Sequence, residues 1–135
     1  AYALRQEVLT EVFESINTYE DNNFYSKAIG DVEKAMMLFG ETVELKSKKT
    51  ELIVKRSEFV LFGTVTGQLI FQSEKLNTAL SDLHKNAPFR FKEVSALLKQ
   101  QVKMSLENNF QLGMPSEGAL AIEKALNSYQ KQVTI

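Results

Sequence analysis

His84 is the only histidine in this chain of 135 residues, which also contains no cysteine. Histidine titrates near neutral pH and often binds metals, so chemistry is best sought around it. Ser81 and Asp82 are close in sequence, but a serine triad needs groups that converge from separate backbone positions. A di-iron bundle needs two Glu-x-x-His motifs, and zinc here would need carboxylates for its other ligands. The sequence therefore predicts no catalytic residue and no metal site, and it predicts that His84 caps a helix C-terminus or is partly exposed there.

The hexapeptide Ala79-Leu80-Ser81-Asp82-Leu83-His84 resembles the proximal haem-ligand segment of globins. The lengths of chain before and after the histidine are also similar to those of globins. The resemblance implies that His84 is the axial ligand of a haem iron and that Phe91 begins a following helix. The chain departs from the family in its distal region, which has no second histidine and has Phe39 approximately where a ring-stacking phenylalanine is expected.

Other residue patterns indicate packing or partner binding. Gly63 and Gly67 are not followed by Lys-Ser or Lys-Thr, so they do not form a nucleotide-binding loop. On a helix the two glycines would share one face, where two backbones could approach closely. The Met36-Met37-Leu38-Phe39 cluster can form an adaptable groove for a partner protein, although methionine in a helical core is the commoner case.

The composition is that of a globular domain, with 44% hydrophobic and 24% charged residues. The length fits one domain with a real core, so we predict a single helical-bundle domain over residues 1–135. No run of about 18 apolar residues occurs, and charged residues flank the longest apolar block, 59–71. We therefore expect no membrane insertion by this chain. The absence of cysteine fits a reducing compartment such as the cytoplasm, but it fits a disulfide-free periplasmic domain as well, so the compartment is unknown.

Charge is unevenly distributed along the chain. Residues 1–44 carry three basic and nine acidic side chains, a net charge of −6, whereas residues 45–103 carry eleven basic and five acidic, a net charge of +6. A nucleic-acid-binding protein more often has a basic excess overall, and the net charge here is −1, so no nucleic-acid partner is expected. The two blocks can instead attract each other within the fold or across an oligomer.

The N-terminal part has the periodicity of helices. Apolar residues at three- and four-residue steps predict a helix over 2–20, and 21–23 predict a break that caps the following helix. That helix should carry a heptad seam, formed by Tyr25, Ile29, Val32, Met36, Phe39 and Val43. The polar run 46–50 is the expected turn after it.

The central stretch from Glu51 to Leu83 permits two interpretations. Apolar residues from Phe59 to Leu83 continue in heptad steps, which predicts one long central helix over about 51–85. Alternation between 42 and 71 and the Thr-Val-Thr sequence instead favour a small antiparallel sheet, and hence an α+β fold. The borders lack the usual hairpin turn residues, so the helix is preferred.

The C-terminal part should contain two more helices. Pro88 cannot continue a helix, so it ends the central element, and the next helix is expected over 89–107. Asn108-Asn109 and Gly113-Met114-Pro115 predict a loop, and Ser116 is a reasonable N-cap for a last helix over 119–133. Together the elements predict an all-α bundle of four to five helices.

Three functional hypotheses follow. The first is a non-enzymatic helical protein-interaction or regulatory module that acts through partner binding or self-association, because of its heptad seams and opposed charge blocks. The second is a ligand-sensing helical-bundle domain of a membrane receptor, since helical periodicity runs almost to both ends of a chain that starts without methionine. The third is a globin-like haem-binding sensor domain that uses His84; the first two require no cofactor.

Overall fold

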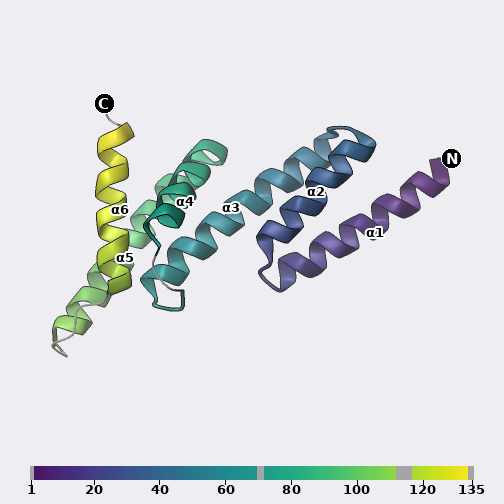
Figure 1. Ribbon diagram of the computed structural model, residues 1–135. Coiled ribbons are helices and arrows are strands. Elements are labelled where there is room, and N and C mark those ends of the chain that lie inside the picture. Colours follow the sequence, from purple (N-terminus) through teal and green to yellow (C-terminus); the bar gives the residue numbers. More distant parts are fainter. Residues whose placement is uncertain (1, 70–71, 112–116, 134–135) are drawn as a thin grey trace. The chain divides into compact units, whose positions relative to one another are not determined.

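The computed structural model describes residues 2–69, 72–111 and 117–133 of the chain. Within these ranges the protein is all-α, with six helices and no strand (Figure 1). The helices are α1 (Tyr2–Asp21), α2 (Tyr25–Phe39), α3 (Val43–Val65), α4 (Ser73–Asn86), α5 (Pro88–Gln111) and α6 (Glu117–Val133). The predicted all-α class is confirmed. The alternative sheet within 42–71 is wrong for the residues described there, because 43–65 form one helix.

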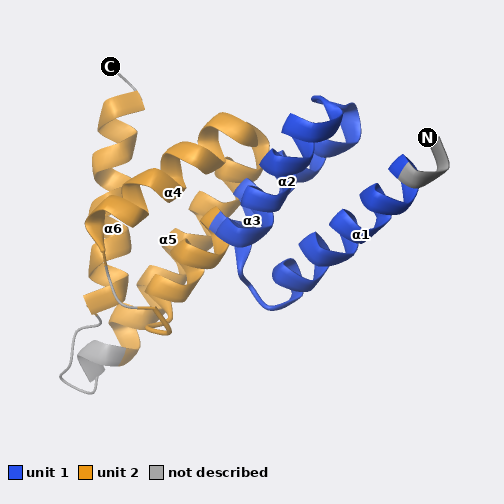
Figure 2. Ribbon diagram, turned by 45° about the vertical axis from the view of Figure 1, so that its right-hand side comes forward, with its two compact units in different colours: residues 1–56 blue, residues 57–135 orange. Residues whose placement is uncertain are grey.

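The chain divides into two compact units, residues 1–56 and residues 57–135, and α3 contributes to both (Figure 2). Each unit packs its helices around apolar side chains. The buried side chains of the first unit are Ile16, Ala28, Ile29, Val32, Ala35, Leu45 and Leu52. In the second unit the largest fully buried apolar side chains are Leu61, Leu76, Leu80, Leu83, Val94, Leu98 and Ile122. The prediction of one domain over 1–135 stays a prediction.

The predicted count of four to five helices and the long central helix over 51–85 are wrong. The helix ends at Val65, and α4 begins only at Ser73. Gly67 has a φ of +82°, which a residue with a side chain rarely adopts. The N–H of Leu69 then donates to the carbonyl of Gly63 (3.0 Å), and the leucine side chain folds over that glycine. The heptad pattern gave no sign of this break, because it reports the spacing of apolar residues and not their backbone angles.

The turn between α1 and α2 caps the end of α1. Asn23 has a φ of +63°, its N–H donates to the carbonyl of Glu20 (3.0 Å), and the N–H of Phe24 donates to the carbonyl of Tyr19 (2.8 Å). This pair of hydrogen bonds around a left-handed residue is the Schellman motif. Residues 21–23 were predicted to cap the following helix. That prediction is wrong, because no side chain caps the N-terminus of α2.

The second chain reversal lies earlier than predicted. α2 ends before Gly40, which has a φ of +88°, and the side chain of Thr42 accepts a hydrogen bond from the N–H of Leu45 (3.2 Å) at the start of α3. The polar run 46–50, predicted as a turn, lies inside α3. Val43 therefore does not continue the seam of α2: its side chain is 79% exposed.

Pro88 separates α4 from α5 as predicted, because it occupies the first helical position, where no backbone donor is needed. Residues 108–109, expected in a loop, lie within α5. The predicted loop at 113–115 and the N-cap at Ser116 lie outside the described residues. No helix in the described ranges is long and apolar enough to cross a membrane.

Candidate functional site

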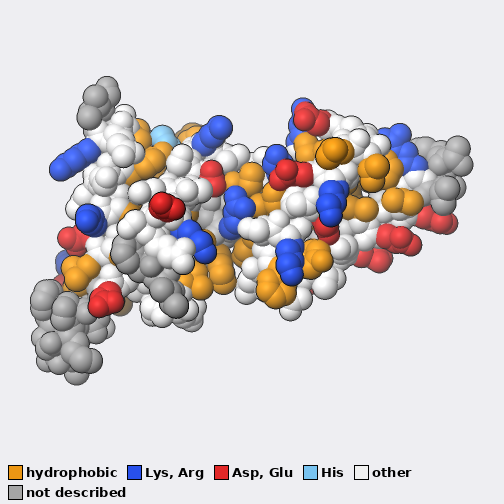
Figure 3. Space-filling model, viewed as in Figure 1, with side chains coloured by type: hydrophobic (Ala, Val, Ile, Leu, Met, Phe, Trp, Pro, Cys, Tyr) orange, Lys and Arg blue, Asp and Glu red, His pale blue; other side chains and the backbone are white. Residues whose placement is uncertain are grey.

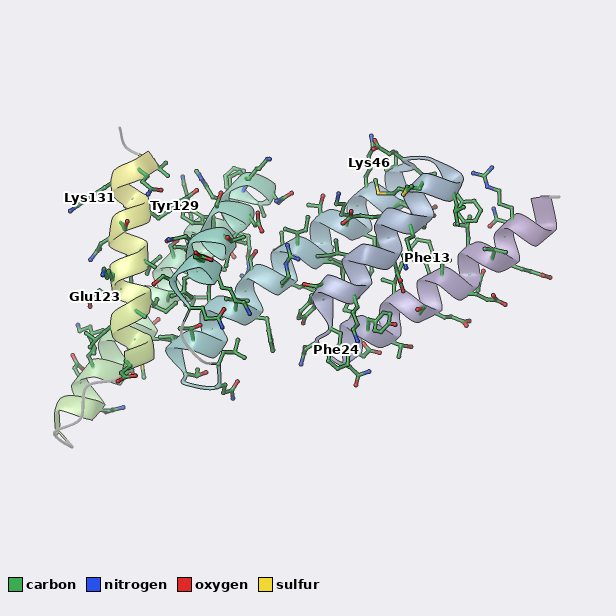
Figure 4. The ribbon with its side chains drawn as sticks, viewed as in Figure 1. Phe13, Phe24, Lys46, Glu123, Tyr129 and Lys131 are labelled. Carbon is green, nitrogen blue, oxygen red and sulfur yellow. The ribbon has the colours of Figure 1, made fainter. Side chains whose placement is uncertain are left out.

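His84 lies in the last turn of α4 and is half-buried in an aromatic cluster. Its Nδ1 is 2.8 Å from the hydroxyl oxygen of Tyr129 on α6. The ring of Phe91, on α5, lies 4.6 Å from the histidine ring centre and 5.4 Å from that of the tyrosine. Figure 4 shows Tyr129 on the side of α6 that faces α4. The sequence prediction had placed His84 at the helix end but had not foreseen that three helices meet there.

The chemistry of this cluster is that of a packing contact. Burial raises the pKa of Tyr129 above its ordinary value, so the phenol keeps its proton at neutral pH. The tautomer of His84 then decides which partner donates the hydrogen bond. The hydrogen bond to Tyr129 thus occupies one of the two ring nitrogens of His84. Phe91 begins no helix, since α5 starts at Pro88. Binding of haem to His84 stays a prediction.

A network of opposite charges joins α1 to α3 in the first unit. The carboxylate of Glu20 accepts hydrogen bonds from Lys48 (2.7 Å) and from Lys55, and Lys55 also reaches Glu51 at 3.0 Å. Burial alone would raise the pKa of Glu20, but the hydrogen bonds from the two lysines outweigh it and lower the pKa. At these residues the acidic first third of the chain pairs with the basic middle within one unit.

A second ion pair joins α3 to α5 in the other unit. Nε and Nη2 of Arg90 donate to one carboxylate oxygen of Glu58, at 3.0 and 2.5 Å, and Nη1 donates to Glu93 at 3.0 Å. These contacts fix helices against each other. Across the part of the chain that the structure describes, no group of three or more acidic, histidine or cysteine side chains is placed to hold a metal ion.

Large apolar side chains are exposed where α2 meets α3. Met37 and Leu38, in the last turn of α2, are 87% and 75% exposed, and Val43 begins α3 with similar exposure. Figure 3 shows hydrophobic side chains on the surface over α2, near its junction with α3. Folding normally removes such side chains from water, so their exposure around one corner marks a surface suited to contact with another molecule.

A groove of about 330 Å³ lies beside this corner, between α1 and the start of α3. It is lined by Arg5, Gln6, Leu9, Phe13, Thr42, Val43, Glu44 and Leu45. Arg5 is held at its edge: Nη2 donates to the carbonyl of Phe39 (3.0 Å), and the guanidinium lies 5.2 Å from that ring's centre. Val43 belongs to both the groove and the exposed corner. We call the groove together with Met37, Leu38 and Val43 the corner site.

The sequence indicated part of the corner site. The cluster 36–39 was singled out as a possible partner surface, and it divides by face: Met36 and Phe39 pack against the core, whereas Met37 and Leu38 face solvent. Val43 was assigned to the buried seam, so its role was missed. Gly40 was the sequence signal that could have separated Val43 from the seam, because a glycine that ends α2 places the residues after it on a new helix.

Comparisons of the chain with protein-family models, with curated proteins and with solved structures found no match.

Proposed function

We propose that the protein is a non-enzymatic helical interaction module whose corner site binds a helix of a partner protein. The observation that supports this most directly is the exposure of Met37, Leu38 and Val43 within seven positions of the chain. Methionine suits such a surface, because its unbranched, polarisable side chain adapts to differently shaped partners. Any regulatory role of the protein would depend on the identity of the partner that binds at the corner site.

The size of the apolar surface decides whether the corner alone is sufficient. Burying each of the three side chains contributes about 1.5–3 kcal/mol, while association costs about 4–15 kcal/mol in lost freedom of motion. The three side chains thus only balance that cost. The groove must supply the rest, with the half-buried Leu9 and Phe13 as further apolar contacts.

A helix is the partner element that fits this arrangement. An amphipathic helix can lay one apolar face into a groove between two helices while its polar face stays in water. At the edge of the corner site, Glu44 lies in the first turn of α3 and Arg5 lies on α1. These two charges would orient the partner helix, since exposed charges contribute more to orientation and association rate than to affinity.

The test is photo-crosslinking in cells that express the protein naturally. A photoreactive amino acid is placed at position 37, 38 or 43, and crosslinked proteins are identified by mass spectrometry. We expect one protein to be captured from all three positions, and we expect Leu9→Asp, which charges the groove, to abolish that capture.

Lys27 provides the matched control position, because it is exposed on α2 and lies about 15 Å along the helix from Met37. The same probe at position 27 should not capture that protein. Equal capture from position 27, or capture that Leu9→Asp leaves unchanged, would overturn the proposal. Capture of a second copy of this chain would replace partner binding by self-association.

A further inference from the structure

Two consecutive methionines at the end of α2 lie in opposite environments. Met36 is half-buried and packs against the core of the first unit, whereas Met37 is 87% exposed. Met104, on α5 in the other unit, is 55% exposed. Among the methionines that the structure describes, Met37 is therefore the one most fully open to solvent.

The thioether sulfur of methionine reacts with peroxides. A lone pair of the sulfur attacks one oxygen of hydrogen peroxide, and an S–O bond forms as the O–O bond breaks. The proton of the attacked oxygen passes to the departing hydroxide, which leaves as water, so the sulfur is oxidised to a sulfoxide and the peroxide is reduced. Cysteine thiolates compete for peroxide in other proteins, but this chain contains no cysteine. Within this chain the reaction therefore falls to the methionines, and first to the most exposed one.

Oxidation at position 37 should leave the fold intact. A sulfoxide is polar and chiral, so it disrupts apolar contacts wherever the methionine is buried. Met37 has few such contacts to lose, because nearly all of its surface is in water. The same reaction at Met36 would place a polar oxygen against the core. The two neighbouring positions thus separate a change of surface from a loss of stability.

The surface that would change belongs to the corner site. Met37 is exposed together with Leu38 and Val43, and these three side chains form its apolar corner. A partner helix that covers the corner must take the side chain at position 37 out of water. This transfer is favourable for the thioether, whereas the sulfoxide would lose hydrogen bonds to water without replacing them. Oxidation at this position therefore opposes binding.

We propose that Met37 is a modification site at which oxidation by hydrogen peroxide releases the partner from the corner site. This inference rests on the proposed function, because it needs a partner whose contact includes Met37. A methionine sulfoxide reductase would reverse the change: two thiols are oxidised to a disulfide, their hydrogens leave with the oxygen as water, and the thioether is restored. Met104 has no such effect, because it lies outside the corner site.

The selectivity of the reaction is measured on the purified full chain. Hydrogen peroxide is added in increasing amounts and removed with catalase, and the sulfoxide fraction at each methionine is determined by peptide mass spectrometry. We expect Met37 to be oxidised several-fold faster than Met36, because it is the more exposed. The midpoint of urea unfolding should not change when Met37 is oxidised and Met36 is not. Equal rates at the two positions, or unfolding that accompanies oxidation of Met37, would overturn the inference.

The effect on binding is measured with the protein that is captured by crosslinking at the corner site. The purified chain carries the photoreactive amino acid at position 43, is oxidised and freed of peroxide, and is titrated with that protein. The concentration that gives half-maximal crosslinking should rise at least about tenfold, the factor expected when the burial of one methionine side chain is lost. Treatment with methionine sulfoxide reductase should restore the original value.

Two leucine variants show which sulfur is responsible. Met37→Leu removes the oxidisable atom and keeps an apolar side chain at the corner; whatever the affinity of this variant, peroxide should not change it. Met104→Leu is the matched control, because it removes an exposed methionine outside the corner site. The control variant should bind like the wild type and should lose the same factor on oxidation.

The outcomes distinguish this inference from the proposed function. Full binding by the chain oxidised at Met37, or loss of binding by the oxidised Met37→Leu variant, would overturn the inference and leave partner binding at the corner site intact. If the untreated chain captures no protein, the proposed function fails, and the inference fails with it.

Discussion

Gly118 is the glycine whose replacement should be most destabilising. It lies at the start of α6 directly against the carbonyl oxygen of Thr64 at the end of α3, and the space contains no room for a Cβ. Gly118→Ala would force these two backbones apart, because neither contact atom belongs to a flexible side chain. We expect a loss of about 1–3 kcal/mol in the free energy of unfolding, measured by urea denaturation.

Gly30→Ala is the control for Gly118→Ala, and it should change the stability in the opposite direction. It lies inside α2, and a Cβ there would meet no atom within 4 Å. Alanine costs less backbone entropy than glycine in a helix, so Gly30→Ala should stabilise the protein by about 0.5–1 kcal/mol in the same measurement. Equal effects of the two substitutions would show that the Gly118–Thr64 contact does not constrain the fold.

The hydroxyl of Tyr129 should contribute separately from its ring. Tyr129→Phe keeps the contact with Phe91 but leaves the Nδ1 of His84 without its partner. We expect a loss of about 0.5–1.5 kcal/mol, the usual value of one hydrogen bond, measured by thermal or urea unfolding. Tyr19→Phe is the control, because that hydroxyl bonds to no described residue. Equal losses of stability in the two variants would show that the hydrogen bond between Tyr129 and His84 does not stabilise the fold.

The sequence identified His84 as the side chain to examine, but not its partners. Phe91 and Tyr129 come from two later helices, and the hydrogen bond depends on how those helices pack. Local spacing carries no such information. The same holds for Gly118: the two glycines singled out as sites of close helix approach were Gly63 and Gly67, yet the close approach occurs at α6.

Between elements, the Glu20 network should make the first unit sensitive to acid. The pKa of Glu20 is lower in the folded chain than its unfolded value of about 4.3, so the carboxylate stabilises the fold above that pH. This stabilisation is lost as the pH falls through the folded-state pKa. Glu20→Gln should cost about 1–2 kcal/mol at pH 7, a value between an exposed ion pair and a buried charged hydrogen bond.

The measurement is the stability of wild type and variant between pH 7 and pH 3. The difference between them should shrink in the acid range, because the wild-type carboxylate becomes neutral there. Glu14→Gln is the control, since this exposed residue on the same helix has no side-chain ion pair with a described residue. A constant difference at all pH values would show that the network contributes no charge-dependent stability.

Most helices could be predicted from periodicity, whereas two of the breaks could not. The first helix, the proline boundary at 88 and the last helix agree with the sequence patterns. The breaks at 40–42 and after 65 depend on the positive φ of Gly40 and Gly67, and in the second case on the folding back of Leu69. A glycine tolerates a positive φ without requiring one, so the sequence shows only that a break in the helix is possible at these positions.

At the scale of the whole chain, the opposed charge blocks have two different outcomes. Glu20 pairs with the basic middle of the chain inside one unit, whereas the exposed Lys99 and Lys103 form no ion pair with a described residue. Net charge along the sequence therefore did not distinguish charges that stabilise the fold from charges that stay in water. Val43 shows the same for apolar residues, because the heptad steps assigned it to the buried seam and its side chain is exposed.

The contact of Gly118 with Thr64 also sets an order of events on the ribosome. The first unit is a continuous stretch of sequence, so its helices can pack as soon as they emerge. The end of α3 cannot complete its packing until α6 is synthesised, and at about 5–20 residues per second this delay is about 3–10 s. During that interval Thr64 and Val65, which lie against Gly118 in the folded chain, lack this contact.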